Sequence, residues 1–179
     1  MDFTVVIPAR YQSSRFPGKP LANIQGKPMV QHVVDRANEA GASKVIVATD
    51  DERIASVAAQ FATVVMTATT HTSGTERIAE VIQTQQIADE TIIVNVQGDE
   101  PFVPADNIRQ VAANLAANPA MQMATLCTPI THEDDVFNPN IVKAVFSASG
   151  KALYFSRSVL PFARDTMMQP PVSADPGLY

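Results

Sequence analysis

The sequence contains a single cysteine, Cys127, so no disulfide can form within the chain. It has no apolar run approaching the roughly 18 residues of a membrane-spanning helix. No charged segment followed by an apolar stretch opens the chain, as it would in a secretion signal. These absences predict a cytoplasmic protein with no membrane insertion, where thiols stay reduced. We expect the Cys127 thiol to be buried within its apolar neighbourhood.

Positive charge is also scarce, with 13 Lys and Arg residues against 18 Asp and Glu residues and a formal net charge of −5. A nucleic-acid-binding protein normally presents a clustered basic face. The one dense basic cluster here lies in residues 9–20, with the sequence ARYQSSRFPGKP. The charge balance therefore favours a small anionic ligand over nucleic acid.

Four apolar, β-rich runs recur along the first part of the chain, at residues 3–8, 44–49, 63–67 and 91–96. They are continuous rather than alternating, which is typical of parallel strands covered on both faces. Helical patterns follow these runs at residues 28–40 and then from about residues 50, 74 and 104. This alternation predicts an α/β fold with a parallel sheet and right-handed crossovers.

The pattern changes after Pro119. Strand-like segments follow at residues 122–130, 141–146 and 152–158. We expect these segments to add antiparallel or mixed strands to the edge of the sheet.

The basic cluster directly follows the first predicted strand and contains Arg10, Arg15 and Lys19. Open α/β sheets bind ligands at the carboxyl ends of their strands. Arginine offers a planar donor fork and lysine a mobile point charge, and both suit phosphate. The segment has neither a Walker A nor a GxGxxG pattern, which argues against a P-loop NTPase or an NAD enzyme. We expect a loop whose side chains bind a triphosphate; the alternative is a solvated basic loop.

A carboxylate follows the fourth predicted strand, in the sequence NVQGDEP at residues 95–101. The same edge of the sheet should carry the basic loop, and Mg²⁺ often binds one or two carboxylates together with substrate phosphates. Asp99 is therefore the predicted metal ligand, with Glu100 the weaker choice. The alternative is an ordinary turn, because Gly-Asp is common in turns.

A helix start at residues 71–77, with the sequence HTSGTER, offers free N–H groups to an anion or a base carbonyl. Ser73 or Thr75 can cap the helix, and capping alone would explain the serine, the threonine and the glutamate. Arg77 is less expected, because a cation in the first turn opposes the helix dipole. We therefore expect an anionic group near Arg77.

The last candidate residues are Arg157 and Arg164, near the end of the sequence. Both can bind the carboxylate of a second substrate. The alternative is a pair of surface ion pairs, which are common and weak.

Several segments together resemble the family of 3-deoxy-manno-octulosonate cytidylyltransferases. They are VIPARY at 6–11, PGKP at 17–20, GKPM at 26–29, VATD at 47–50, SGTER at 73–77, VNVQGDEP at 94–101, FNPN at 137–140 and YFSR at 154–157. Their number and order make the resemblance specific.

The resemblance implies a Rossmann-like nucleotide-diphospho-sugar transferase fold, with a mixed, mostly parallel sheet between helices. It implies a transferase that uses Mg²⁺ to convert CTP and 3-deoxy-D-manno-octulosonate (Kdo) to CMP-Kdo and pyrophosphate, for lipopolysaccharide biosynthesis. It implies catalytic roles for Arg10, Arg15, Lys19 and Asp99, with Asp99 on the metal. It also implies nucleotide contacts from Ala9, Arg10, Arg15, Lys19, Ser73, Arg77 and Gln97, and sugar contacts from Gln97, Tyr154, Arg157 and Arg164.

Family members are longer, so the resemblance predicts a single nucleotidyltransferase domain over residues 1–179 that lacks its C-terminal part. The absent part would carry a second metal-binding aspartate and most of the surface of a homodimer. Three other interpretations remain at this stage. They are a cytidylyltransferase for another acidic sugar such as sialic acid, a non-catalytic sugar-nucleotide-binding module, and a glycosyltransferase. The last would need an Asp-x-Asp motif where the chain reads Asp99-Glu100-Pro101.

Overall fold

The structure is a computed structural model that describes residues 1–12, 16–162 and 164. The chain divides into two compact units, Met1–Leu126 and Cys127–Tyr179. The first unit contains the parallel sheet, and the second contains a small antiparallel hairpin. The expectation of one nucleotidyltransferase domain without its C-terminal part stays a prediction.

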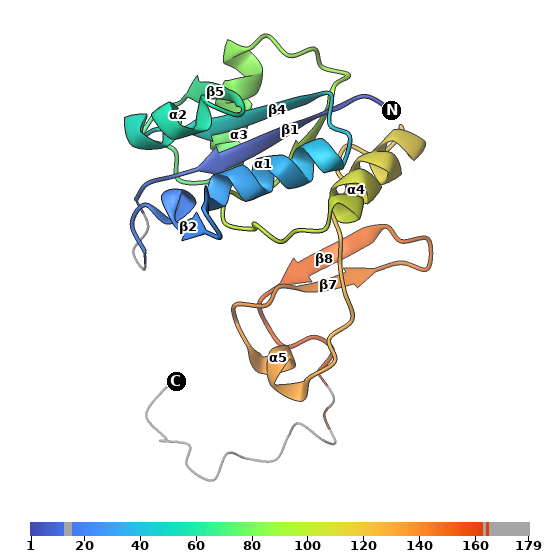
Figure 1. Cartoon of the computed structure of the whole chain (residues 1–179). Coiled ribbons are helices and arrows are strands. Elements are labelled where there is room, and N and C mark those ends of the chain that lie inside the picture. The colour runs from blue at the N-terminus through green and yellow to red at the C-terminus, as the bar shows by residue number, and fades with distance from the viewer. Residues whose placement is uncertain (13–15, 163, 165–179) are drawn as a thin grey trace. The chain divides into compact units, whose positions relative to one another are not determined.

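Four parallel strands form the sheet of the first unit, in the order β5-β4-β1-β6 (Figure 1). They are β1 (Phe3–Ala9), β4 (Lys44–Thr49), β5 (Thr63–Met66) and β6 (Ile92–Asn95). Central β1 pairs with β4 on one side and β6 on the other, with Val5 opposite Val45 and Val94. All four predicted strands are confirmed to within a residue or two at their ends.

Four longer helices cover the two faces of this sheet: α1 (Met29–Glu39), α2 (Glu52–Ala58), α3 (Gly74–Thr84) and α4 (Ala105–Ala117). Residues of α1, α2 and α4 share the larger core with one face of the sheet. Helix α3 packs alone on the opposite face (Figure 1). The predicted fold class is therefore confirmed.

Side chains of β1 alternate between these two cores. Val5 and Ile7 enter the larger core, and Val6 enters the smaller one. Every residue of β1 is buried, because successive side chains point to opposite covered faces. This explains the continuous apolar run in the sequence and holds the carboxyl end of β1 rigidly at one edge of the sheet.

Short elements complete the fold. In the first unit they are a 3-10 helix, η1 (Lys19–Leu21), and a small antiparallel pair, β2 (Asn23–Ile24) with β3 (Lys27–Pro28). In the second unit they are α5 (Glu133–Phe137), β7 (Lys143–Phe146) and β8 (Ala152–Ser156). No helix in the described ranges is both long and apolar enough to cross a bilayer.

The expectation for the later strands is partly wrong. Strands β7 and β8 are antiparallel, as expected, but they form a separate sheet and do not extend the edge of the parallel one. Residues 122–130 form no strand, because no described neighbour pairs with their backbone. Cys127 lies in this segment and is exposed, so its predicted burial is also wrong.

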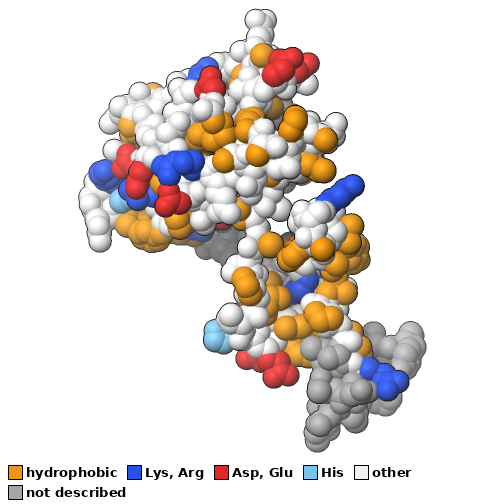
Figure 2. All heavy atoms as spheres, turned by 90° about the vertical axis from the view of Figure 1, so that its right-hand side faces the viewer, with side chains coloured by type: hydrophobic (Ala, Val, Ile, Leu, Met, Phe, Trp, Pro, Cys, Tyr) orange, Lys and Arg blue, Asp and Glu red, His pale blue; other side chains and the backbone are white. Residues whose placement is uncertain are grey.

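Hydrophobic side chains remain exposed on the hairpin of the second unit. Figure 2 shows orange side chains over much of its visible surface. They include Phe146, Leu153, Tyr154 and Phe155, which are each more than half exposed. An isolated two-stranded hairpin is marginally stable at best in water, so this unit has little core of its own.

We predict that Ile46→Ala destabilises the first unit by about 2–5 kcal/mol, because Ile46 is fully buried in the small core under α3. The loss combines the transfer free energy of the removed methyl and methylene groups with the cost of the cavity that they leave. Urea unfolding measures the loss. The matched change Ile130→Ala removes an exposed isoleucine and should stay within about 0.5 kcal/mol. Equal losses for both variants would contradict this account of the core.

Candidate active site

The carboxyl ends of β1 and β6 approach each other closely. The backbone N–H of Gly98 donates a hydrogen bond to the carbonyl oxygen of Pro8 at 3.2 Å. A Cβ atom at Gly98 would lie 2.8 Å from that oxygen and 3.3 Å from Cβ of Ala9. Only glycine fits without moving the backbone, so the loop after β6 is held against the start of the basic loop.

This approach brings together two of the predicted catalytic residues. Nζ of Lys19, from η1, lies 2.8 Å from Oδ2 of Asp99, which follows β6. Their side chains are 36% and 51% exposed, so both remain accessible to a ligand. The structure therefore places the predicted phosphate-binding lysine and the predicted metal ligand in direct contact.

The basic loop connects β1 to η1. Arg10 is exposed at its start, whereas Arg15 lies outside the described residues. The backbone N–H of Gly18 donates to the carbonyl oxygen of Tyr11 at 2.8 Å and closes the base of the loop. Ala9 is buried as the last residue of β1, so its side chain supports the loop rather than facing solvent.

The start of α3 meets the same edge of the sheet. A Cβ atom at Gly74 would lie 3.4 Å from Cγ of Pro8 and 3.6 Å from Nε2 of Gln97. Exposed Gln97 donates to Oδ1 of Asn95 at 3.0 Å. Ser73 caps the helix through a hydrogen bond from the backbone N–H of Glu76 at 3.2 Å. The capping explanation for Ser73 holds, and its predicted contact with the nucleotide stays a prediction.

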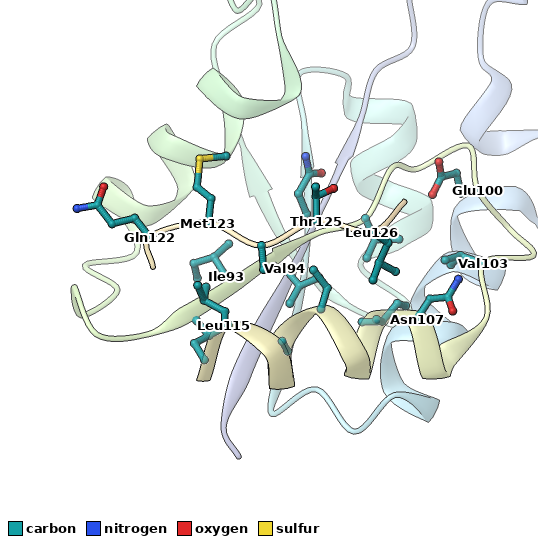
Figure 3. A pocket seen from close by; sticks show the side chains of 17 residues that line it. Ile93, Val94, Glu100, Val103, Asn107, Leu115, Gln122, Met123, Thr125 and Leu126 are labelled. Carbon is teal, nitrogen blue, oxygen red and sulfur yellow. The ribbon is translucent and has the colours of Figure 1, made fainter. Parts of the chain in front are cut away.

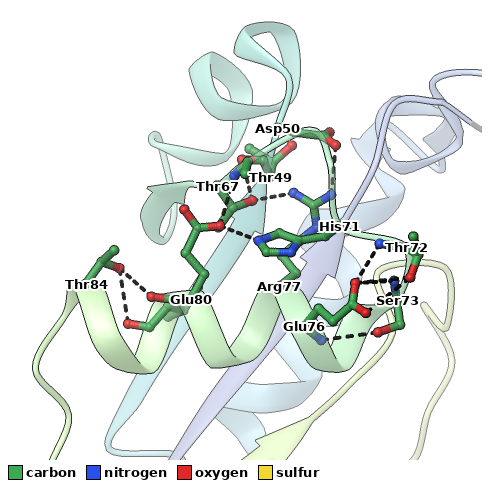
Figure 4. A network of polar contacts seen from close by, with 12 residues as sticks. Thr49, Asp50, Thr67, His71, Thr72, Ser73, Glu76, Arg77, Glu80 and Thr84 are labelled. Atoms are coloured by element: carbon green, nitrogen blue, oxygen red, sulfur yellow. Dashed lines mark hydrogen bonds and ion pairs between the residues drawn. The ribbon is translucent and has the colours of Figure 1, made fainter.

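Arg77 is the fully buried centre of a polar network that joins three elements (Figure 4). Its Nη2 atom lies 2.8 Å from Oδ2 of Asp50, which is 13% exposed. Its Nη1 atom donates to the hydroxyl of Thr67, which in turn donates to the carbonyl oxygen of Thr49 at 3.1 Å. The expected anionic group near Arg77 is thus Asp50. A direct contact between Arg77 and a nucleotide stays a prediction.

A second part of this network holds the segment that leads into α3. Oε2 of Glu80 accepts from the backbone N–H of Ala68 at 2.9 Å and lies 2.5 Å from Nε2 of His71 (Figure 4). The Ala68 N–H, followed by His71, holds the pKa of Glu80 below its usual range. The backbone and hydroxyl of Thr72 likewise lower the pKa of Glu76. Two ionised carboxylates therefore fix residues 68–73 against the helix.

The predicted sugar-binding residues belong to the second unit. Tyr154 is 57% exposed on β8. The Nη1 atom of Arg157 donates to the carbonyl oxygen of Pro139 at 2.6 Å, which ties the end of β8 to the FNPN segment. Arg164 is also described and has an interaction partner. Their contacts with a sugar stay predictions.

A pocket of about 530 Å³ lies beside this edge, between β6, α4 and residues 122–126 (Figure 3). Its walls are mostly apolar and include Ile93, Val94, Leu115, Met123 and Leu126. Asn95 and Glu100 contribute polar groups. Among the described residues, neither Arg10 nor Lys19 lines the pocket, so we do not assign the triphosphate to it.

Two residues of this edge, Tyr11 and Arg53, were not predicted as site residues from the sequence. The guanidinium carbon of Arg53 lies 3.3 Å from the ring centroid of Tyr11, at the base of the basic loop. Arg53 is the second residue of α2 and lies more than forty positions away from Tyr11 in the sequence. No short motif links the two, and only the acidic start of α2 was a visible signal.

A metal at this edge would have the carboxylate of Asp99 available, with exposed Glu100 next to it in the chain. No group of three or more His, Cys, Asp or Glu side chains arranged to hold a metal ion occurs in that part of the chain. The donor set still fits Mg²⁺, which commonly uses one or two carboxylates together with substrate phosphates. The ammonium group of Lys19 already lies beside Asp99 and shows that a cation is accommodated there.

Known proteins with the same fold identify the class. The sequence profile described as cytidylyltransferase matches residues 4–174. A solved structure of CMP:2-keto-3-deoxy-manno-octonic acid synthetase, in complex with CTP, superposes with a TM-score of 0.85 at 42% identity. The match covers 92% of this chain and 68% of that one. A nucleotidyl transferase from Methanothermobacter, at 20% identity and a TM-score of 0.54, shares the fold.

Relatives with higher sequence identity indicate the family within this class. A 3-deoxy-manno-octulosonate cytidylyltransferase from Alteromonas mediterranea is 66% identical over all 179 residues, which is 72% of its own length. One from Idiomarina loihiensis is 60% identical over 92% of this chain and 66% of its own length. The chain thus spans about two thirds of the length of these relatives, slightly more in the first case.

The fold and these matches define a nucleotidyltransferase, as the sequence predicted. The chain belongs to the family of 3-deoxy-manno-octulosonate cytidylyltransferases, which confirms the resemblance seen in its motifs.

We predict that Asp50→Ala destabilises the protein by about 3 kcal/mol, because it leaves the fully buried Arg77 charge without its carboxylate. Chemical denaturation measures the loss. The matched control is Asp35→Ala, which breaks the exposed ion pair with Lys27 and should cost about 1 kcal/mol or less. Similar losses in both variants would mean that the Asp50–Arg77 pair behaves as a surface pair.

We predict that Glu80→Gln destabilises the protein at neutral pH and that the difference shrinks in acid. The folded-state pKa of Glu80 is lowered, so its contribution is present above the ordinary glutamate pKa of about 4.5 and is lost as pH falls through the folded value. Thermal unfolding of both proteins between pH 7 and pH 3 measures this. Glu39→Gln, at an exposed pair with Arg36, is the control. A difference that grows towards acid would contradict the sign.

Proposed function

We propose that the protein catalyses transfer of the cytidylyl group of CTP to Kdo, which yields CMP-Kdo and pyrophosphate. The observation that carries this proposal is the 2.8 Å contact between Lys19 and Asp99 at the carboxyl edge of the sheet, beside the basic loop. A phosphate-binding cation and a metal-binding carboxylate must lie close together if they are to act on one triphosphate. Family membership supports the choice of nucleotide and sugar.

The triphosphate would be bound by Arg10, Arg15 and Lys19 of the basic loop. Arg10 and Lys19 flank the closed base of this loop, so the backbone positions that carry their side chains are fixed. The cytidine would lie towards Ala9, Ser73 and Gln97, where the start of α3 meets β1. Buried Arg77 would support this position through Asp50 and Thr67.

The residue that would hold Mg²⁺ is Asp99, with phosphate oxygens of CTP completing the coordination. When bound, the ion would neutralise charge that develops on the phosphates. Lys19 would then leave the Asp99 carboxylate and bind the triphosphate. The exposed pair allows this, because such pairs contribute little to stability.

The reaction would proceed by in-line attack at the α-phosphorus. The anomeric hydroxyl oxygen of Kdo forms the new bond, and the bond from the α-phosphorus to the bridging oxygen of the β-phosphate breaks. Pyrophosphate leaves with the electron pair, and the hydroxyl proton passes to solvent. The protein contributes mainly positioning and positive charge from Arg10, Arg15 and Lys19.

The residues proposed for the sugar are Gln97, Tyr154, Arg157 and Arg164. Arg157 and Arg164 supply cations for the carboxylate of Kdo, and Tyr154 supplies an exposed ring with a hydroxyl group. The product would serve lipopolysaccharide biosynthesis in the cytoplasm, and the protein would act as a homodimer. These points extend the proposal and rest on the family rather than on contacts in the structure.

The deciding experiment is pyrophosphate release from CTP, Kdo and Mg²⁺, with UTP and sialic acid as alternative substrates. Release that requires both CTP and Kdo supports the proposal. Release with sialic acid in place of Kdo would favour a different acidic sugar. CTP binding without any release would favour a sugar-nucleotide-binding module. Asp99→Asn should abolish release, and a variant with full activity would overturn the metal assignment.

We predict that Lys19→Met weakens CTP binding about tenfold or more, because a charge-assisted contact to phosphate is lost. Calorimetric titration with CTP measures the change. Lys27→Met is the matched control, since Lys27 is an exposed lysine that also pairs with an aspartate at 2.8 Å. Its CTP affinity should equal that of the unchanged protein. Equal weakening by both changes would point to net charge rather than to a site.

A further inference from the structure

A backbone hydrogen bond closes the base of the basic loop. The N–H of Gly18 donates to the carbonyl oxygen of Tyr11 at 2.8 Å, and the Gly18 carbonyl accepts from Leu21 at 2.8 Å inside η1. Arg10 precedes this base and Lys19 follows it. The geometry of the base therefore sets the backbone positions from which the side chains of Arg10 and Lys19 extend.

The ring of Tyr11 packs against Gly18. Gly18 has a φ of +72°, and a Cβ atom there would lie 3.0 Å from Cε2 of Tyr11 and 3.3 Å from its hydroxyl oxygen. The glycine thus permits both the left-handed backbone and the close approach of the ring. Any movement of the ring would change the base of the loop.

The Tyr11 ring also contacts Arg53. The guanidinium carbon lies 3.3 Å from the ring centroid, which is a close cation–π stack. The guanidinium is held in place by both oxygens of Asp51, with Nε to Oδ1 at 2.9 Å and Nη2 to Oδ2 at 2.6 Å. This bidentate contact fixes the plane of the guanidinium as well as its position.

Asp51 in turn is anchored to the rigid part of the fold. It caps α2 by accepting from the backbone N–H of Arg53 at 2.9 Å, and its own N–H donates to Oγ1 of Thr49 at the end of β4. The hydrogen bonds from Arg53 hold the pKa of Asp51 below its usual range, so the carboxylate is charged at neutral pH. A continuous stack thus runs from β4 through Asp51, Arg53 and Tyr11 to Gly18.

We propose that Arg53 is a positioning residue for nucleotide binding: stacked on Tyr11, it holds the base of the loop in the geometry that presents Arg10 and Lys19 to the triphosphate. The inference rests on the proposed function, because it assumes that this loop binds the phosphates of CTP. Arg53 itself acts through Tyr11. Its guanidinium already engages Asp51 and the ring, and those contacts persist while the nucleotide binds.

The first test measures the CTP dissociation constant of Arg53→Ala. Loss of an exposed cation–π stack should raise it about 2- to 5-fold, with kcat at saturating CTP and KM for Kdo unchanged. Arg36→Ala removes another exposed arginine, paired with Glu39 on α1, and should leave the constant unchanged. An unchanged constant in Arg53→Ala overturns the proposal.

Two further variants separate stacking from charge. Tyr11→Leu removes the ring and should weaken CTP binding as Arg53→Ala does, while Tyr11→Phe keeps the ring and should bind normally. The double variant Arg53→Ala with Tyr11→Leu should bind no more weakly than either single one. Additive losses, or normal binding by Tyr11→Leu, would make Arg53 a direct phosphate contact and overturn the positioning role. Arg53→Lys keeps the charge but not the bidentate plane, so full rescue would also overturn it.

Hydrogen exchange of the Gly18 amide gives a readout independent of catalysis. In the nucleotide-free protein, Arg53→Ala should speed exchange of this amide, whereas Arg36→Ala should not. Unchanged exchange in Arg53→Ala would contradict the proposed stack. The measurement also distinguishes failure of this proposal from failure of the proposed function. Absence of Kdo-dependent pyrophosphate release would overturn the proposed function. The exchange and CTP-binding results would still decide the role of Arg53.

Discussion

The contact between Gly98 and Pro8 is the constraint on which the candidate site depends. The amide of Gly98 lies 3.2 Å from the Pro8 carbonyl oxygen, and no side chain fits between them. Asp99 follows directly, so its carboxylate is delivered to the edge of the sheet where β1 ends and the basic loop begins. Because β1 is buried along its whole length, this reference point is rigid. The 2.8 Å contact between Asp99 and Lys19 is a consequence of that approach.

Charges at this edge occur as pairs whose burial matches their proposed roles. Arg77 is fully buried against Asp50 and joins β4, β5 and α3. Arg53 and Asp51 lie at the surface and support the loop base through the Tyr11 ring. Lys19 and Asp99 are the most accessible pair, in which each partner retains substantial exposure. A buried pair is costly to break and suits a framework, whereas an exposed pair exchanges partners easily and suits ligand binding.

Much of the fold was predictable because the sequence carries local signals for it. The apolar runs of β1, β4, β5 and β6 marked parallel strands, and the Ser73–Glu76 capping box marked the start of α3. Residues 122–130 carried a similar apolar signal but form no strand, because a strand requires a pairing partner that periodicity does not reveal. The exposure of Cys127 follows from the same missing partner. Arg77 showed only that an anionic group was needed, and the structure identifies that group as Asp50.

The sequence by itself determined the order of strands and helices, the family, and the residue types available at the carboxyl edge of the sheet. Hydrophobic periodicity, capping and motif order are local properties, so they can be read along the chain. Only the tertiary structure decided which of those residues meet. The stack of Arg53 on Tyr11 and the pairing of Lys19 with Asp99 join positions far apart in the chain. Such contacts depend on strand order, β5-β4-β1-β6, and on backbone distances that no local pattern encodes.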